Sequence, residues 1–329
     1  MISSSQIRDA NERIRGHVLR TPLVVSQSLT ERCGFAVALK LEHQQTTGSF
    51  KLRGATNAIL SLDTAAREKG VVAASTGNYG RALAFAARAV GSRATICMSK
   101  LVPDNKVSEV RRLGADVRII GNSQDDAQRE VERLVAEEGL TMLPPFDHRD
   151  IIAGQATVGS EILEDMPDAI TVLVPLSGGG LAAGVTAAVK AKNPKTRVIG
   201  ISMRRGAAMK ASLDAGRPIE VEEFPSLADS LGGGIGLDNG FTFSMCRDLL
   251  DDVVLLSEAE IAAGILHAYQ HEREVVEGAG AVGIAALLAN KIADIAGPVA
   301  VVLSGRNIDM GLHRRIVNGE QDPFGGDKE

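Results

Sequence analysis

Short apolar runs and helical segments alternate along almost the whole chain. Residues 36–42 read Ala-Val-Ala-Leu-Lys-Leu-Glu, which has the alternation of a half-buried strand. Further short apolar strands are expected at 71–75, 94–99, 117–121 and 141–143. Helical patterns separate them, at 50–62, 81–90, 105–113 and 124–138. This alternation of strand and helix patterns is typical of βαβ units and predicts a parallel sheet covered by helices on both faces.

A second series of strands and helices follows the pair Pro144-Pro145, which interrupts the first. It opens with a predicted helix at 151–163. Strands are expected at 171–175, 197–202, 253–256 and 299–303. Helices are expected at 181–191, 207–215, 258–271 and 281–291. No internal repeat or flexible linker interrupts this order before a polar tail after residue 318, so the pattern predicts two closely joined α/β lobes.

Charge and hydropathy narrow the classes of partner. The 329 residues include 36 basic and 41 acidic side chains mixed along the sequence, for a net charge of -5. Without a basic stripe, neither nucleic acid nor anionic lipid is an expected partner. No apolar run approaches the roughly 20 residues that span a membrane. The N-terminus lacks the apolar core of a targeting peptide, and residues 6–15 after Ser3-Ser4-Ser5 resemble a capped amphipathic helix. We expect a soluble, cytoplasmic protein.

The cysteines and one histidine pair do not predict a metal centre. Cys33, Cys97 and Cys246 lie far apart without a Cys-x-x-Cys pair, which suits a reducing cytosol and argues against disulfides and thiolate-bound zinc. We expect these thiols to be buried and to fill space in the hydrophobic core. His267 and His271 are four residues apart on a predicted helix, but no His-Glu-x-x-His motif joins them. Both are expected to be solvated.

The stretch Thr46-Thr47-Gly48-Ser49-Phe50-Lys51 places one lysine at the corner between a predicted strand and a predicted helix. A lysine amine that is held partly dry in a fixed setting can condense with an aldehyde to a Schiff base. We therefore interpret Lys51 as the covalent anchor of pyridoxal 5'-phosphate (PLP). The ordinary alternative is a solvated helix lysine, because surface lysines are abundant. Three further stretches favour the first interpretation.

Two of these stretches have the form of anion sites. Ser75-Thr76-Gly77-Asn78-Tyr79-Gly80 lies between a buried strand and a helix, whose positive end suits a substrate carboxylate. An ordinary strand-to-helix turn is the alternative there. Ser177-Gly178-Gly179-Gly180-Leu181 has the same setting, but it lacks the Gly-Lys-Ser/Thr ending of a nucleotide P-loop. One phosphate therefore fits this loop better than a magnesium-bound triphosphate.

The third stretch, Leu303-Ser304-Gly305-Arg306-Asn307, ends the last predicted strand and offers a hydroxyl to a ring nitrogen. All four stretches lie at or just beyond the carboxyl ends of predicted parallel strands, where open α/β sheets bind ligands. In this ordered set the chain resembles the fold-type II PLP enzymes (tryptophan synthase β-like), and within them the threonine/serine dehydratases and serine racemases. The resemblance also includes Arg20-Thr21-Pro22-Leu23, Ile152-Ala153-Gly154-Gln155 and Glu277-Gly278-Ala279-Gly280-Ala281.

The resemblance implies a role for each site residue. Lys51, with Phe50 beside it, would anchor PLP and move the Cα proton. Asn78 would bond the ring hydroxyl, Glu277 would line the pocket and Ser304 would face the pyridine nitrogen. The phosphate would lie in the loop of Ser177, Gly178, Gly179, Gly180 and Leu181, and the substrate carboxylate in the loop of Ser75, Thr76, Gly77, Asn78 and Tyr79. A neutral serine does not hold the ring nitrogen protonated, so β-elimination is favoured over transamination.

The implied activity is that of an ammonia-lyase, which dehydrates a β-hydroxy-α-amino acid to a 2-oxo acid and ammonia. Thr76 stands where serine racemases have a second acid/base serine, which argues against racemase activity. Tyr79 replaces a usual histidine and Arg306 a glycine, and with residues 226–234 these look most like the dehydratase of hydroxyectoine utilisation. A racemase of the same fold is the alternative. A non-catalytic amino-acid-binding protein is the alternative from another class, although a pure binder has no need of a Schiff-base amine.

The resemblance also implies an organisation for the whole chain. A large PLP-binding domain would comprise 1–47 and 151–329, and a small domain, 48–150, would be inserted in it. The protein would be a homodimer that acts on a small amino acid.

Two other sites are not expected. Related enzymes often hold a divalent cation through a glutamate that closes the strand after the glycine loop and an aspartate six residues later. Ser202 and Ala208 stand at those positions here, and Arg204 and Arg205 add positive charge. The match to G-x-G-x-x-G at 278–283 has no clear strand before it and no acidic residue about 20 positions later, so NAD is not expected there.

Overall fold

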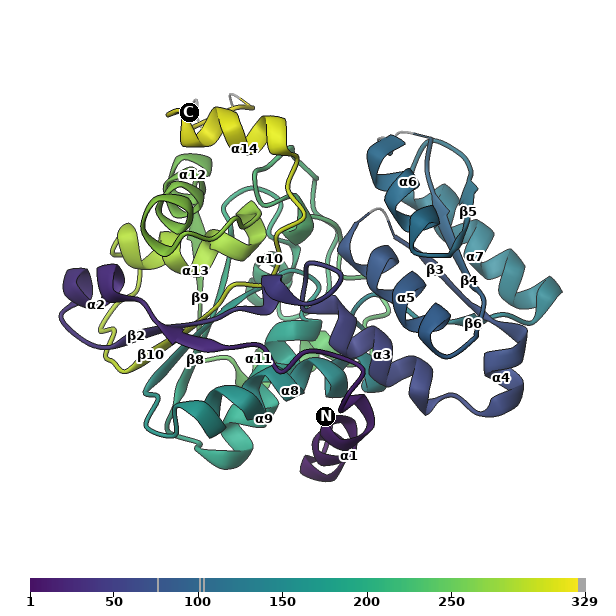
Figure 1. The fold of residues 1–329 in the computed structure, drawn as a ribbon, viewed down its shortest axis with the longest axis horizontal. Coiled ribbons are helices and arrows are strands. Elements are labelled where there is room, and N and C mark those ends of the chain that lie inside the picture. Colours follow the sequence, from purple (N-terminus) through teal and green to yellow (C-terminus); the bar gives the residue numbers. More distant parts are fainter. Residues whose placement is uncertain (76, 101, 103, 325–329) are drawn as a thin grey trace.

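The computed structural model describes residues 1–75, 77–100, 102 and 104–324, and its strands form two separate sheets (Figure 1). The six-stranded sheet has the order β1 (Leu23–Val25), β2 (Val37–Lys40), β10 (Val299–Val302), β7 (Thr171–Pro175), β8 (Arg197–Met203) and β9 (Asp252–Leu256). The four-stranded sheet has the order β5 (Asp116–Ile119), β4 (Ala94–Met98), β3 (Val71–Ala74) and β6 (Thr141–Met142). Every neighbouring pair is parallel except β1 and β2, which confirms the predicted α/β class.

The strands are short and buried on both faces, so alternate residues pack against different helices. In the four-stranded sheet, Val71 and Ala73 face α3 (Lys51–Ser61) and α5 (Asn78–Ala89), whereas Val72 and Ala74 face α7 (Gln124–Glu138). The six-stranded sheet is layered in the same way. One face packs on α8 (Arg149–Asp165), α9 (Gly180–Lys192) and α11 (Thr242–Leu249), and the other on α12 (Glu258–His267) and α13 (Gly278–Leu288).

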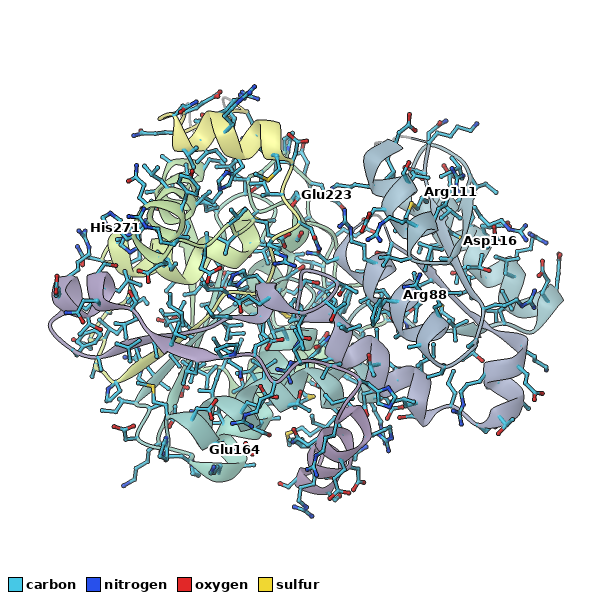
Figure 2. The ribbon with its side chains drawn as sticks, viewed as in Figure 1. Arg88, Arg111, Asp116, Glu164, Glu223 and His271 are labelled. Atoms are coloured by element: carbon cyan, nitrogen blue, oxygen red, sulfur yellow. The ribbon has the colours of Figure 1, made fainter. Side chains whose placement is uncertain are left out.

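The remaining helices are peripheral or short. They are α1 (Ser4–Ile14), α2 (Gln27–Cys33), α4 (Thr64–Lys69), α6 (Asp104–Arg112), α10 (Ala208–Ala215) and α14 (Met310–Val317), with 3-10 turns at Glu42–Gln44 and Asp229–Leu231 and a π turn at Ala268–Glu272. Charged side chains such as Arg111, Asp116 and Glu164 lie at the surface of the molecule (Figure 2). No helix within the described residues has the length and apolar character to cross a bilayer.

Helix α3 lies between the two sheets and packs closely on α8 (Figure 1). Glycines make this approach possible, because a Cβ at Gly154 would lie 2.7 Å from the carbonyl oxygen of Arg53. A Cβ at Gly54 would lie 2.9 Å from the carbonyl oxygen of Ile151. The first turn of α3, which carries Lys51, is thereby held against a long helix of the other sheet's layer.

A buried ionic cluster includes Arg53, which lies on the same turn. The Arg53 guanidinium donates to Glu42 at 2.7 and 2.8 Å and to Glu161 at 2.7 Å, and Lys40 donates to Glu161. Two cations face two carboxylates, so the charges of the cluster balance. Because each charge is paired and hydrogen-bonded, the cluster avoids the cost of isolated buried ions.

Several short elements were not predicted from the sequence. They are β1, α2, α4, α11 and α14, none longer than 8 residues, which is too short for a clear helical or strand period. The segment predicted as one helix at 258–271 is α-helical only to His267 and then forms the π turn. Helix α5 begins at Asn78, three residues before the predicted start at 81.

Two side-chain expectations are wrong. His267 is not solvated: its side chain is 11% exposed, and its Nε2 lies 2.9 Å from Ser28 Oγ and 3.1 Å from Glu272 Oε1, because α2 covers this end of α12. Of this pair, only His271 is exposed (Figure 2), and its ring stacks on that of His267. Cys97 and Cys246 are buried as expected, but Cys33 is only partly buried.

Candidate active site

Lys51 is the first residue of α3, and its amine turns toward the segment that enters α8. Its Nζ donates to the carbonyl oxygen of Pro145 at 2.9 Å. The same atom lies 5.2 Å from the ring centroid of Phe50 and 5.8 Å from that of Tyr79. Burial among these groups lowers the pKa of Lys51 to about 8, although Glu277 opposes the shift. Lys51 is therefore far more readily deprotonated than a surface lysine, which is what a nucleophilic amine requires.

Backbone pairing joins the lysine corner to the end of β10. Ser49 and Gly305 form an antiparallel bridge, flanked by hydrogen bonds from Phe50 N to Ser304 O at 3.0 Å and from Arg306 N to Gly48 O at 2.9 Å. Gly48 has a φ of +79°, and a Cβ on it would lie 2.5 Å from Asn307 Oδ1. A glycine is needed at this position on both grounds. The pairing brings together two of the stretches identified from sequence.

Glu277 is buried at the start of α13 and accepts hydrogen bonds from two directions. Asn78 Nδ2 donates to its Oε1 at 2.8 Å, and the backbone N–H of Asn307 donates to its Oε2 at 3.0 Å. Burial, and after it the negative charge of Asp229, raises the pKa of Glu277 to about 7, although these hydrogen bonds oppose the shift. The carboxyl group therefore changes its protonation state near neutral pH.

Asn307 connects this carboxyl to α5. Its Nδ2 donates to Asn78 Oδ1 at 2.5 Å and to Thr47 O at 3.0 Å, while its Oδ1 accepts from Arg81 at 3.1 Å. The role of Asn307 was not evident from the sequence, and Arg81 was not identified. The only available signal was the position of Asn307 at the end of the last strand, because the contact with Arg81 spans 226 residues of chain.

The glycine loop passes between an aromatic ring and two helices. A Cβ at Gly178 would lie 2.5 Å from the Phe146 ring, and one at Gly179 would lie 2.7 Å from Met209 Cε. Gly179 also has a φ of +89° and is the N-cap of α9. The first N–H groups of a helix have no intrahelical acceptor, so this cradle suits an anion. Phe146 follows Pro145, the residue that binds Lys51, so one short segment contacts both the amine and the loop.

The other predicted residues differ in what they offer to a ligand. Ser304 is buried, and its hydroxyl donates to Ala279 O at 3.3 Å. Ser75 Oγ accepts from the N–H of Gly80 at 2.9 Å and so shapes the turn that precedes α5. Ser177 is partly buried, whereas Leu181 packs in the hydrophobic core. Thr76 lies outside the described residues.

Tyr79 presents its ring rather than its hydroxyl to Lys51. Its Oη donates to Leu143 O at 2.9 Å, and the residue is 2% exposed. Burial raises the pKa of this phenol, so it remains neutral at any physiological pH. The polar end of Tyr79 is therefore committed to the backbone of the four-stranded sheet's layer.

The glycines at 278 and 280 allow α13 to approach neighbouring loop backbone closely. A Cβ at Gly278 would lie 2.1 Å from Leu227 O, and one at Gly280 would lie 2.6 Å from Gly305 O. These close approaches give a packing reason for both glycines. Among the residues that the structure describes, no group of three or more His, Cys, Asp or Glu side chains could hold a metal ion.

Comparison with known proteins identifies the family. Residues 14–305 match the model of the pyridoxal-phosphate dependent enzyme family. The chain belongs to this family. It is 70% identical over 318 residues to a "Putative threonine dehydratase" of Sinorhizobium fredii, covering 97% of this chain and 96% of that protein. It is 42% identical over 319 residues to an L-threonine ammonia-lyase of Thermotoga maritima, covering 97% of this chain and 79% of that protein.

Maize serine racemase superposes with a TM-score of 0.91 at 33% identity, covering 95% of this chain and 96% of that one. The fold is therefore that of the fold-type II PLP enzymes, as the sequence predicted.

The residues present fit this cofactor. An amine of lowered pKa suits its aldehyde, and a glycine cradle at a helix N-terminus suits its phosphate. Beside Lys51, the buried hydroxyls of Thr47 and Ser49 have no hydrogen-bond partner within the described part of the chain. Buried polar groups are normally hydrogen-bonded, so these two unpaired hydroxyls indicate that a polar ligand completes the site.

Proposed function

We propose that this protein is an ammonia-lyase that converts a β-hydroxy-α-amino acid to a 2-oxo acid and ammonia. The observation that carries the proposal is the Lys51 amine, whose pKa is lowered to about 8 beside a buried carboxyl–amide network. The family membership and the dehydratase and ammonia-lyase relatives support it.

Bound PLP supplies an electron sink that stabilises negative charge at the substrate Cα. Lys51 would anchor the cofactor and, once its amine is free, would take the Cα proton. The β-hydroxyl leaves with a proton as water, and the released enamine is hydrolysed to the 2-oxo acid and ammonia. The water lost in the first step is regained in the last, so the sum is one amino acid to one 2-oxo acid and one ammonia.

The other site residues bind and orient. We assign the phosphate to the loop Ser177, Gly178, Gly179, Gly180 and Leu181, the ring hydroxyl to Asn78, and the ring nitrogen to Ser304, with Phe50 and Glu277 lining the pocket. The loop Ser75, Thr76, Gly77, Asn78 and Tyr79 holds the substrate carboxylate at the positive end of α5. A neutral Ser304 leaves the ring a weaker electron sink, which directs the reaction toward loss of the β-substituent.

A coupled assay for keto acid and ammonia tests the reaction and its substrate together. The panel is threonine, serine, 3-hydroxyaspartate and the hydroxylated diaminobutyrate that hydroxyectoine yields. We expect release of keto acid and ammonia in equal amounts from at least one of them. If none is turned over by PLP-loaded protein, the reaction class is wrong.

Racemisation is the second candidate, and the similarity to maize serine racemase is the observation that favours it. Chiral analysis of the unconsumed substrate separates the two activities. A dehydratase leaves the remaining amino acid in its original configuration, whereas a racemase accumulates the opposite enantiomer.

We further propose a cytoplasmic homodimer in which 1–47 with 151–329 forms a large domain and 48–150 a small one. The distribution of strands supports the division, since β3 to β6 make up the four-stranded sheet and all other strands join the six-stranded sheet. Light scattering of the purified protein should give a mass of two 34.6 kDa chains. The mass of one chain would contradict the dimer.

A further inference from the structure

We propose that Arg81 is a positioning residue that fixes the amide orientation of Asn307 and, through it, that of Asn78. The inference rests on the proposed function only in that Asn78 contacts the cofactor. Arg81 itself lies one helical turn from Asn78 on α5, and nothing in its contacts requires it to touch the cofactor or the substrate.

Four side chains form a chain of hydrogen bonds in which each side chain donates to the next. Arg81 donates to Asn307 Oδ1 at 3.1 Å, Asn307 Nδ2 donates to Asn78 Oδ1 at 2.5 Å, and Asn78 Nδ2 donates to Glu277 Oε1 at 2.8 Å. The chain begins at a cation and ends at a carboxyl group. It also alternates between the two sheets' layers, because Arg81 and Asn78 lie on α5 whereas Asn307 and Glu277 flank β10 and α13.

The guanidinium selects one of two amide orientations at Asn307. In the observed orientation its Nδ2 meets two acceptors, Thr47 O and Asn78 Oδ1, and its Oδ1 meets the Arg81 donor. A flipped amide would place oxygen against both acceptors and its NH₂ against the guanidinium. Since arginine has donors and no acceptor, it can satisfy only the observed orientation.

Asn78 inherits its orientation from Asn307. With its Oδ1 occupied by the Asn307 donor, its Nδ2 must point to Glu277. A ligand hydroxyl beside Asn78 therefore meets an amide that cannot rotate. Preorganised groups of this kind bind better than freely rotating ones, because binding does not have to order them.

Asn307 is the short side-chain contact of Arg81 within the described residues. The Arg81 side chain is 21% exposed, and the carboxylate of Glu109 lies 3.9 Å from it, farther than Asn307 at 3.1 Å. Arg88 lies on the same helix, on the side of the molecule that holds the four-stranded sheet (Figure 2). Its side chain donates a hydrogen bond to Arg112 O at 3.4 Å. Arg88 is therefore a matched control that removes an arginine from α5 without touching the chain of hydrogen bonds.

The test measures PLP affinity on protein that has been stripped of cofactor and titrated with PLP by absorbance. We expect Arg81→Met to weaken binding about tenfold, the scale of one hydrogen bond to a charged group. Arg88→Met should leave the affinity unchanged, and Arg81→Lys, which keeps a cationic donor, should recover part of the loss. In an Asn307→Ala background, Arg81→Met should change the affinity less than twofold, because the residue through which Arg81 acts is gone.

Two results would overturn the inference. One is wild-type affinity in Arg81→Met. The other is an equal loss in both backgrounds, which would mean that Arg81 acts on the fold and not through Asn307. Should Arg81→Met not fold, Asn307→Asp decides: it keeps the shape but removes the Nδ2 donor, and wild-type affinity in that variant would also overturn the inference. If the wild-type protein binds no PLP, the proposed function fails instead.

Discussion

Lys51 and Glu277 are two titratable groups whose environments move their pKa values toward neutrality from opposite sides. Burial lowers the pKa of the amine to about 8 and raises that of the carboxyl to about 7. Pairs of groups with values shifted in this way are typical of catalytic sites. Each can be tested by a single substitution.

Replacing Lys51 by alanine should abolish both the chemistry and the covalent link. We expect turnover to fall by about a thousandfold or more, because the proposed anchor and the proposed proton-transfer group are lost together. Mass spectrometry after borohydride reduction should find no cofactor attached to the Lys51→Ala chain, whereas Lys195→Ala, at an exposed position, should retain it. A reducible link that survives in Lys51→Ala would mean that another lysine is the anchor.

Glu277 should give the protein a recognisable pH dependence of stability. Its folded pKa of about 7 lies above the usual value of 4.5, so the native state binds a proton that the unfolded state releases. Its contribution is complete below about pH 4.5 and is lost as the pH rises through 7, by up to about 3 kcal/mol.

Urea unfolding of cofactor-free protein between pH 5 and 8 measures this effect. The free energy of unfolding of the wild-type protein should fall with pH relative to Glu277→Gln, which cannot titrate. Glu68→Gln, at an exposed position, should keep the wild-type slope. Parallel profiles for wild type and Glu277→Gln would show that this carboxyl titrates at its ordinary pKa when folded.

At the scale of elements, the contact between α3 and α8 decides where Lys51 is placed. Alanine is a better helix former than glycine by about 1 kcal/mol, so Gly154→Ala would stabilise an isolated α8. In the protein its Cβ would lie 2.7 Å from Arg53 O and the helices must separate. We expect a net destabilisation of about 2 kcal/mol, together with weaker PLP binding as Lys51 shifts.

The control for this prediction is Gly234→Ala, where a Cβ would have no atom within 4 Å and the backbone has no positive φ. Thermal unfolding and PLP titration of both variants are the measurements. A Gly154→Ala protein as stable as wild type, with unchanged PLP affinity, would show that the helices separate at no cost.

At the scale of the whole molecule, the buried cluster of Arg53, Glu42, Glu161 and Lys40 joins β2, α3 and α8. Burial favours the neutral form of Glu42, but the neighbouring Arg53 outweighs it and lowers the pKa of this carboxyl. Arg53→Met would leave two buried carboxylates facing one lysine. Breaking a buried pair in this way costs about 3–5 kcal/mol.

The surface pair of Arg20 with Glu164 provides the comparison. Both side chains are about half exposed, so Arg20→Met should cost about 1 kcal/mol or less. Urea midpoints of the two variants give the measurement. Equal losses would mean that the buried cluster contributes no more than a surface ion pair.

The sequence by itself determined most of the elements and marked the strand ends that are candidate ligand sites. The periods of its apolar residues placed most strands and the longer helices within a few positions, because each buried strand must present apolar side chains to both helical layers. The glycine and serine stretches marked the strand ends for a similar local reason: a tight strand-to-helix turn needs particular residues. The family resemblance and the Lys51 assignment followed from the order of these stretches.

Only the tertiary structure decided which of these corners touch. The pairing of Ser49 with Gly305, the place of β10 between β2 and β7, and the contact of Arg81 with Asn307 join residues far apart in the chain. No local period encodes such a pairing, because it depends on how whole layers pack. The same holds for the pKa values of Lys51 and Glu277: the residue types are in the sequence, but the burial and the neighbouring charges that shift them exist only once the two sheets' layers have come together.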